Sequence, residues 1–162
     1  MNKKKPDIKE IKKKLTDEQY NICFLKGTEP PFSGKYTDLF DKGIYKCGVC
    51  DTPLFYSHSK FHSDSGWPSF DRPVDKKNIK YENDNSIGVK IIEVTCATCG
   101  AHLGHVFDDG PTKTTKRYCI NSLALEFVKE KELLEFCGVD AKDLIITRSR
   151  TASAVAVASC NV

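Results

Sequence analysis

Two Cys-x-x-Cys pairs form the most specific chemical pattern in the sequence, Cys47 with Cys50 and Cys96 with Cys99. This spacing lets two thiolates of one tight turn occupy adjacent corners of a tetrahedron, about 2.3 Å from a zinc ion. Two pairs complete a four-thiolate site, which leaves no position for water and is therefore predicted to be structural. The alternative, two thioredoxin-type redox motifs, would open helices in a βαβ unit, whereas each pair here follows a β-type run.

A further cysteine, Cys119, lies in the run KRYCINS, apart from both pairs. Alternate side chains of a β-strand share a face, so Arg117, Cys119 and Asn121 would point the same way. A neighbouring guanidinium favours the thiolate, so we expect the pKa of the Cys119 thiol to be lowered and the residue to be a reactive nucleophile. The alternative for an unpaired cysteine is a small, buried hydrophobic residue.

Two of the chain's four histidines, His102 and His105, follow the second cysteine pair directly. Histidine suits acid catalysis near neutral pH, and a nucleophile that breaks a bond to oxygen needs such a proton source. Gly104 between them would permit a β-bulge, and Asp109 is expected to orient an imidazole ring. The histidines could instead be extra metal ligands, but four cysteines already saturate a zinc ion.

The interval between the two cysteine pairs runs for 45 residues, far longer than the roughly 15 to 20 residues of a small zinc ribbon. It contains FHSDSGWPSF, with the only tryptophan of the chain, Trp67, placed before a proline. A lone tryptophan is more often part of the core than held on a turn beside a cleft. The interval is nevertheless long enough to build a substantial piece of structure.

The elements that must position these residues are mostly β-strands. From Gly43 onward, short β-type runs alternate with turns: GIYKC, PLFYS, SIGVKIIEVTC, HLGHVF and KRYCINSLALEFV. This pattern predicts a mainly β, antiparallel domain. Before it, LTDEQYNICFLKG predicts a short helix, with a capping box between Thr16 and Gln19 and a closing Gly27. The segment between them, with two prolines and two glycines, is expected to be an ordered loop.

Length and charge divide the chain of 162 residues into one domain with extensions. Residues 1–14 carry seven lysines, one aspartate and one glutamate, a charge of +5, so the other residues sum to −2 against the chain's +3. This division is typical of a solvated tail, and argues against a nucleic-acid-binding arm or a mitochondrial presequence. We expect a basic flexible tail over 1–14, a domain over 15–130, and an extension over 131–162 with a short helix and a mobile tail.

No apolar run resembles a signal peptide or a membrane span. We therefore expect a soluble protein in a reducing compartment, the cytoplasm, whose eight cysteines do not form a disulfide framework.

Five runs, in order, resemble the B-type methionine sulfoxide reductases: GTEPPFSGKY, GIYKCGVC, SGWPSF, CATCGAHLGHVFDDGP and RYCINS. The resemblance extends from about Leu15 to Val128. It implies two antiparallel sheets in a β-tent or barrel-like arrangement, with one structural Zn²⁺ opposite the active site. It also implies reduction of methionine-R-sulfoxide, protein-bound or free, as in protein repair under oxidative stress. The thiolate would attack sulfur and leave a cysteine sulfenic acid, which a thiol then reduces.

The resemblance also implies a role for each site residue. Cys119 would be the nucleophile, and His105 and His102 would surround the sulfoxide oxygen as proton donors. Trp67 would be the wall for the ε-methyl group of the substrate. The supporting residues would be Asp109, Arg117 and Asn121.

The sequence departs from the family at the resolving cysteine, because Ser65 occupies the usual position. Cys23 at the end of the N-terminal helix and Cys160 near the C-terminus remain possible resolving residues, and Cys137 is a weaker candidate. Thioredoxin is the expected reductant, with direct reduction by a small thiol as the alternative, and the chain is expected to be a monomer. The competing functions are a zinc-ribbon-like binding module for protein or nucleic acid, and a thiol peroxidase. The slightly acidic body and the polar residues around one thiol argue against the binding module. The sequence also lacks the cysteine flanked by proline and threonine that a thiol peroxidase usually has.

Overall fold

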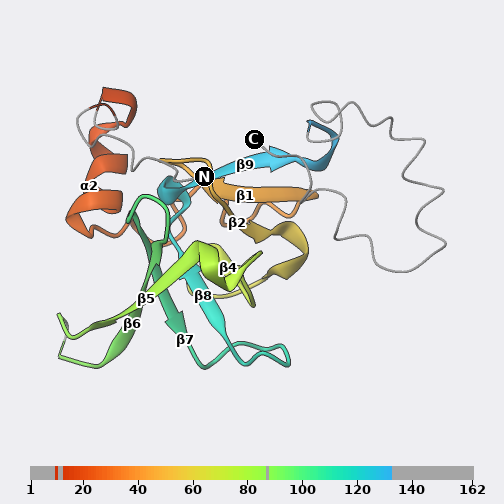
Figure 1. Cartoon of the computed structure of the whole chain (residues 1–162). Coiled ribbons are helices and arrows are strands. Elements are labelled where there is room, and N and C mark those ends of the chain that lie inside the picture. The colour runs from red at the N-terminus through yellow and green to blue at the C-terminus, as the bar shows by residue number, and fades with distance from the viewer. Residues whose placement is uncertain (1–9, 11–12, 87, 133–162) are drawn as a thin grey trace.

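The computed structural model describes residues 10, 13–86 and 88–132 (Figure 1). The expected short helix is α2 (Asp17–Leu25), and its capping box is present. Thr16 Oγ1 accepts the backbone N–H of Gln19 at 3.1 Å, and Gln19 Oε1 accepts the backbone N–H of Thr16 at 3.1 Å. The left-handed C-cap is Lys26, with φ 58°, one residue before the expected Gly27.

Three strands form the smaller sheet, in the order β2-β1-β9. All pairs are antiparallel: β1 (Gly43–Cys47) pairs with both β2 (Pro53–Tyr56) and β9 (Leu125–Lys129). The side chains of Ile44, Tyr45 and Cys47 on the central strand are buried. In Figure 1 these strands lie above the larger sheet.

Six strands form the larger sheet, in the order β3-β4-β8-β7-β6-β5, again with antiparallel pairs only. Their bounds are Lys60–Phe61 for β3, Ser69–Phe70 for β4, Arg117–Ile120 for β8, His102–Phe107 for β7, Ile91–Cys96 for β6 and Ile79–Asp84 for β5. The prediction of a mainly β fold with two antiparallel sheets is confirmed.

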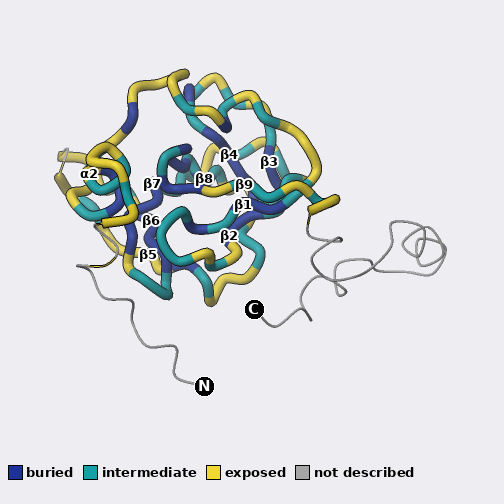
Figure 2. The backbone as a smooth tube through the Cα atoms, turned by 90° about the horizontal axis from the view of Figure 1, so that it is seen from above, coloured by how far each residue is buried: buried dark blue, intermediate teal, exposed yellow. Residues whose placement is uncertain are grey.

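Aromatic side chains from both sheets fill the space between them, where the buried residues of Figure 2 gather. The rings of Phe55 and Phe70 stack at 4.4 Å between centroids, and Tyr45 meets Phe70 edge to face at 5.0 Å. Such ring pairs add to the stabilisation that comes from burial of apolar area. Helix α2 packs against β7 through a face that buries Ile22 and Cys23.

One expected run is divided in the structure, and one six-residue strand was not expected. KRYCINSLALEFV divides into β8 and β9 around the 3₁₀ helix η3 (Ser122–Ala124), so that one run contributes to both sheets. Strand β5 was not expected, because four of its six residues are exposed and the strand lies at the edge of the sheet. An edge strand of this kind carries little of the apolar alternation that reveals a strand in a sequence. The remaining 3₁₀ helices are η1 (Ser57–Ser59) and η2 (Lys76–Asn78).

The expected tail over 1–14 and the extension over 131–162 lie largely outside the described residues, as does Cys160. Among the described residues, no helix has the length and apolar character needed to cross a bilayer.

Candidate active site

The four cysteines of the two pairs converge, with their sulfur atoms all within 4.8 Å of one another. Cys47 Sγ lies 3.7 Å from Cys99 Sγ, and Cys50 Sγ lies 3.6 Å from Cys96 Sγ. A tetrahedral site with zinc–sulfur bonds of about 2.3 Å requires sulfur atoms about 3.8 Å apart. The observed spacing therefore fits a four-thiolate zinc ion and is far longer than a disulfide bond.

The two cysteine turns have the same backbone geometry. In the first, the N–H of Asp51 donates to Cys47 O at 2.9 Å, and in the second, the N–H of Gly100 donates to Cys96 O at 2.8 Å. Both donors are left-handed, with φ 59° for Asp51 and 79° for Gly100. This repeated turn directs the two thiols of each pair toward the same point, which the Cys-x-x-Cys spacing predicted.

A separate cavity of about 600 Å³ contains the predicted catalytic residues. Cys119, His102, His105, Trp67 and Asn121 all line it, and none of the four clustered cysteines does. The other lining residues are Lys26, Thr28, Asp84, Ser86, Ile91, Gly104 and Phe107. The sequence thus predicted five of the residues that the fold brings together around this cavity, and Arg117 and Asp109 lie outside its wall.

A bulge in β7 brings both histidines to the cavity. The pairing of β6 with β7 shifts register between Val94 and Thr95, so that Val94 pairs with Gly104 while Thr95 pairs with His102. The extra residue turns His102 to the same side as His105, although regular alternation would place them on opposite faces. Gly104 also lies against β8, where a Cβ atom would be only 2.0 Å from Cys119 O.

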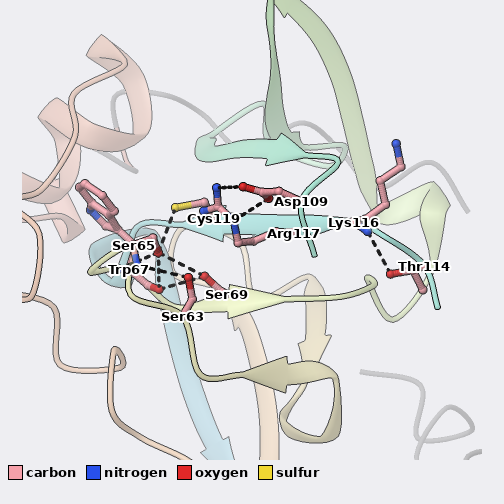
Figure 3. Close-up of polar contacts among 9 residues, drawn as sticks. All are labelled: Ser63, Ser65, Trp67, Ser69, Asp109, Thr114, Lys116, Arg117 and Cys119. Carbon is pink, nitrogen blue, oxygen red and sulfur yellow. Dashed lines mark hydrogen bonds and ion pairs between the residues drawn. The ribbon is translucent and has the colours of Figure 1, made fainter. Parts of the chain in front are cut away.

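The thiol of Cys119 is half-buried, and its Sγ lies 3.9 Å from Ser65 Oγ (Figure 3). Burial raises the pKa of Cys119, and the opposing effects of the Ser65 hydroxyl and the Arg117 guanidinium do not outweigh it. The expectation of a lowered thiol pKa was therefore wrong in sign. The guanidinium acts in the predicted direction, but the sequence did not reveal how strongly the surrounding packing disfavours a charged thiolate.

Asp109 binds Arg117 rather than an imidazole ring. Its two carboxylate oxygens accept from Arg117 Nε and a terminal guanidinium nitrogen, each at 2.8 Å, as Figure 3 shows. This two-point geometry is the one that guanidinium and carboxylate groups favour. The predicted orienting role of Asp109 is thus corrected, because neither histidine is its hydrogen-bond partner among the described residues.

Glu93 is the carboxylate that orients His102. Its Oε1 lies 2.7 Å from His102 Nδ1, and its Oε2 accepts from Lys26 Nζ at 2.6 Å. Burial acts to raise the pKa of Glu93, but the hydrogen bonds from Lys26 and His102 outweigh it and lower that pKa. The pKa of His102 is also lowered, because burial outweighs the bond to Glu93. With Glu93 ionised, Nδ1 of His102 carries a proton and Nε2 is left free of this bond.

Asp84 is the corresponding partner of His105. Its Oδ2 lies 2.8 Å from His105 Nε2, while its Oδ1 accepts the backbone N–H of Ser86 at 2.9 Å. The hydrogen bonds from Ser86 and His105 hold the pKa of Asp84 well below its ordinary value. The two imidazole rings meet edge to face with 5.5 Å between centroids, so each ring is fixed by its own carboxylate.

Sequence reasoning missed Glu93, Asp84 and Lys26. Glu93 did carry a signal, since it is an acidic residue within the apolar run IIEVTC, and it is only 1% exposed. Asp84 and Lys26 carry no local signal, because an exposed edge strand and a helix C-cap commonly end in charged residues.

The possible resolving residues differ in their surroundings. Ser65, in the usual position, hydrogen-bonds to the backbone N–H of Trp67 at 3.4 Å and faces Cys119. Cys23 is 2% exposed, burial raises its pKa to about 12, and it does not line the cavity. A thiol so placed reaches Cys119 only after α2 separates from the core. Cys160 lies outside the described residues.

Comparison with known proteins identifies residues 15–129 as similar to the SelR domain. The chain is 53% identical over 118 residues to the "Peptide methionine sulfoxide reductase MsrB" of Teredinibacter turnerae, covering 73% of this chain and 87% of that protein. It is 50% identical over 123 residues to the protein of the same name from Shigella dysenteriae serotype 1, covering 76% and 90%.

The chain is also 53% identical over 118 residues to the "Methionine-R-sulfoxide reductase B3, mitochondrial" of Mus musculus, of which it covers 47%, about half the length. Among solved structures, the "Crystal Structure of Mis18 'Yippee-like' Domain" aligns with a TM-score of 0.45 and 14% identity, over 55% of this chain and 97% of that one. This last likeness is too low to assign anything.

Proposed function

The chain belongs to the SelR domain family, and on that premise we propose that it is a methionine-R-sulfoxide reductase with Cys119 as its nucleophile. The observation that supports the assignment best is the single cavity shared by one thiol, two carboxylate-bound histidines and an indole. A nucleophile, a proton source and an apolar wall are the three features that reduction of a methyl sulfoxide needs.

In the proposed reaction, the Cys119 thiolate attacks the sulfoxide sulfur while a proton is delivered to the sulfoxide oxygen. The sulfur–oxygen bond of the substrate breaks, and the hydroxyl group is transferred to Cys119. Methionine is released as a thioether, and Cys119 becomes a sulfenic acid, one oxygen atom richer than the thiol. The cysteine sulfur is oxidised by the two electrons that the substrate sulfur gains.

His105 and His102 supply the proton in this proposal. His105 lies directly across from Cys119 in the pairing of β7 with β8, so it faces the reacting sulfur from the next strand. His102 lies beside it, held by Glu93. Glu93 favours the protonated imidazole of His102, which offsets part of the cost that burial imposes on this charged ring.

Trp67 provides the apolar side of the cavity and the histidines its polar side. A methyl sulfoxide carries a methyl group and an oxygen atom on one stereogenic sulfur, so opposed apolar and polar walls distinguish its epimers. We propose that the indole accommodates the methyl group. Asn121 and the pair of Arg117 with Asp109 support the wall and the thiol, respectively.

The four-cysteine site is proposed to hold one structural zinc ion. Its thiols fit the ion and stand apart from the catalytic cavity. Bound zinc would crosslink the turn after β1 to the turn after β6, one from each sheet.

Regeneration requires a second thiol. Its sulfur would displace the hydroxyl group of the sulfenic acid as water and form a disulfide with Cys119, which thioredoxin would then reduce. Cys160, Cys23 or an external thiol would fill this role, and the burial of Cys23 weighs against it. A monomeric state, a cytoplasmic location and the choice between free and protein-bound substrates stay predictions.

The proposal is tested by following N-acetyl-methionine-R-sulfoxide and its S epimer on a chiral column, with dithiothreitol as reductant. We expect loss of the R epimer only, and no turnover by Cys119→Ser. The control Ser33→Ala, which changes a serine that does not line the cavity, should retain the parental turnover. Equal consumption of both epimers, or an active Cys119→Ser variant, would refute the assignment.

A further inference from the structure

Glu29 is a buried carboxylate outside the cavity wall, on the loop between α2 and β1, and it is 4% exposed. Its Oε1 accepts the backbone N–H of Ser122 at 2.6 Å, and its Oε2 accepts the backbone N–H of Leu123 at 3.1 Å. These N–H groups open η3, whose N-cap residue Asn121 makes no side-chain capping bond. The carboxylate therefore takes over the capping of the segment that directly follows the strand of Cys119.

The main chain of the same residue holds two residues of the cavity wall. Its carbonyl oxygen accepts from Trp67 Nε1 at 3.1 Å, and its N–H donates to Asn121 Oδ1 at 3.1 Å. Trp67 comes from the loop before β4, and Asn121 from the end of β8. Glu29 is thus the point at which the N-terminal loop, the indole and the segment after β8 are joined.

The local packing leaves the carboxylate little freedom to move. A Cβ atom on Gly34 would lie 2.7 Å from Glu29 Oε1 and 2.2 Å from Ser122 Oγ, so the absence of a side chain there makes room for the contact. Two backbone donors on one carboxylate fix its orientation, because a displacement of the group breaks charge-assisted bonds to buried N–H groups. The position of the Glu29 main chain follows from that of its side chain.

We infer that Glu29 is a positioning residue for the substrate cavity, whose carboxylate, anchored on η3, sets the main-chain groups that orient Trp67 and Asn121. The inference rests on the proposed function for its kinetic consequence. Its structural part does not, because Trp67 is the only tryptophan in the chain and its fluorescence reports on the indole without turnover. Glu29 acts through other residues and touches no reacting atom.

The main variant is Glu29→Gln, which keeps the volume but replaces one acceptor oxygen by an amide donor that opposes a backbone N–H. We expect KM for N-acetyl-methionine-R-sulfoxide to rise about tenfold, the equivalent of one charge-assisted hydrogen bond, with kcat close to that of the parent. The Trp67 emission should shift to longer wavelength as the indole loses its fixed partner. Glu29→Asp, which keeps the charge but is too short to span both N–H groups, should change both quantities in the same direction.

Two controls separate positioning from a general loss of stability. Asp71→Asn alters another carboxylate that is 6% exposed but does not line the cavity, and Glu18→Gln alters an exposed residue near the Glu29 loop. A smaller folded fraction lowers kcat and leaves KM unchanged, so both controls should retain the parental KM and emission maximum. Measurements are made well below each melting temperature.

Parental KM and parental Trp67 emission in folded Glu29→Gln and Glu29→Asp would overturn the inference. So would a fall in kcat alone, which indicates partial unfolding. If the parent chain reduces neither epimer, the proposed function fails, while the emission of the Glu29 variants against the two controls still decides whether Glu29 positions the indole.

Discussion

Cys119 is surrounded by groups that act on its thiol in opposite directions. Burial raises its pKa, whereas Ser65 and Arg117 lower it, and the negative charge of Asp109 raises it again. The bidentate pair of Arg117 with Asp109 therefore sets how much of the guanidinium charge reaches the thiol. At the scale of single residues, this pair offers a test in which two substitutions have opposite signs.

We expect Arg117→Met to raise the pKa of Cys119 and Asp109→Asn to lower it. Only the thiolate is alkylated, so the rate against pH should shift to higher pH in Arg117→Met and to lower pH in Asp109→Asn. The rate is measured with iodoacetamide, and mass spectrometry of the Cys119 peptide separates this thiol from the other cysteines. Shifts of the same sign in both variants would contradict the account.

Glu93 belongs to the same scale, because it is the one described carboxylate bound to His102. Glu93→Gln removes the charge that favours the protonated ring, so the pKa of His102 should fall further below its ordinary value. The reduction step should then slow, at most by the 10²- to 10⁴-fold that a positioned acid contributes. The fall in its rate at high pH, where His102 loses its proton, should begin at a lower pH.

Single-turnover release of methionine against pH measures this step. The matched control is Glu82→Gln, an exposed glutamate that pairs directly with Glu93 across β5 and β6. A Glu93→Gln profile that coincides with that of Glu82→Gln would remove Glu93 from proton delivery.

At the scale of elements, the bulge in β7 decides whether both histidines reach the cavity. Gly104→Ala would place a Cβ atom 2.0 Å from Cys119 O, and because the contact is with backbone, the strands must separate. We expect a loss of roughly 3 kcal/mol in the free energy of unfolding. Gly88→Ala is the control, since Gly88 also has a positive φ, 75°, but has nothing within 4 Å of the added atom, and it should cost only about 1 kcal/mol.

Urea denaturation of the two variants measures the difference. Equal losses would show that backbone conformation, rather than the close approach of β7 to β8, explains why position 104 is a glycine.

The two cysteine turns belong to different sheets, so a metal ion bound between them would link the sheets. We therefore expect the metal to contribute to folding rather than to chemistry. We predict one zinc ion per chain, and we expect Cys96→Ser to lose it and to unfold at a much lower temperature, because binding energy in such a site is folding energy. Cys23→Ser, which changes a buried cysteine outside the cluster, should keep its zinc. Metal analysis and thermal melting test this, and a Cys96→Ser variant with one zinc and the parental melting temperature would contradict it.

At the scale of the whole molecule, the open question is which thiol reaches Cys119 after oxidation. Ser65 Oγ is already 3.9 Å from the Cys119 sulfur, so Ser65→Cys needs a local shift of only about 2 Å to form a disulfide. Cys160 lies 28 residues beyond the last described residue. The position beside Cys119 lacks a thiol, whereas the residue far along the sequence has one.

We therefore expect Cys160→Ser to lose most thioredoxin-dependent turnover and Ser65→Cys to restore it in that background. Peptide mapping after one turnover without reductant should show Cys119 linked to Cys160 in the parent and to residue 65 in the rescued variant. If the double variant Cys23→Ser with Cys160→Ser cycles with thioredoxin as fast as the parent, and no link to Cys119 is found, an external thiol resolves the sulfenic acid.

Much of this protein is determined locally and could be predicted from the sequence. Three features depend only on residues a few positions apart, and the structure contains all of them. They are the Cys-x-x-Cys turns, the capping box of Thr16 with Gln19, and the runs that become β1, β2 and β7. The convergence of Cys119, His102, His105 and Trp67 was implied by family resemblance, which draws on the same short motifs.

The partners of these residues were decided only by the tertiary structure. Glu93 and Asp84 come from two neighbouring strands, and they meet the histidines because β5, β6 and β7 pair in one register. Lys26, at a helix end, binds Glu93. The pKa of Cys119 is shifted in the opposite direction to the prediction, because charge is visible in a sequence and burial is not. Desolvation depends on every atom packed around the thiol, which only the folded chain brings together.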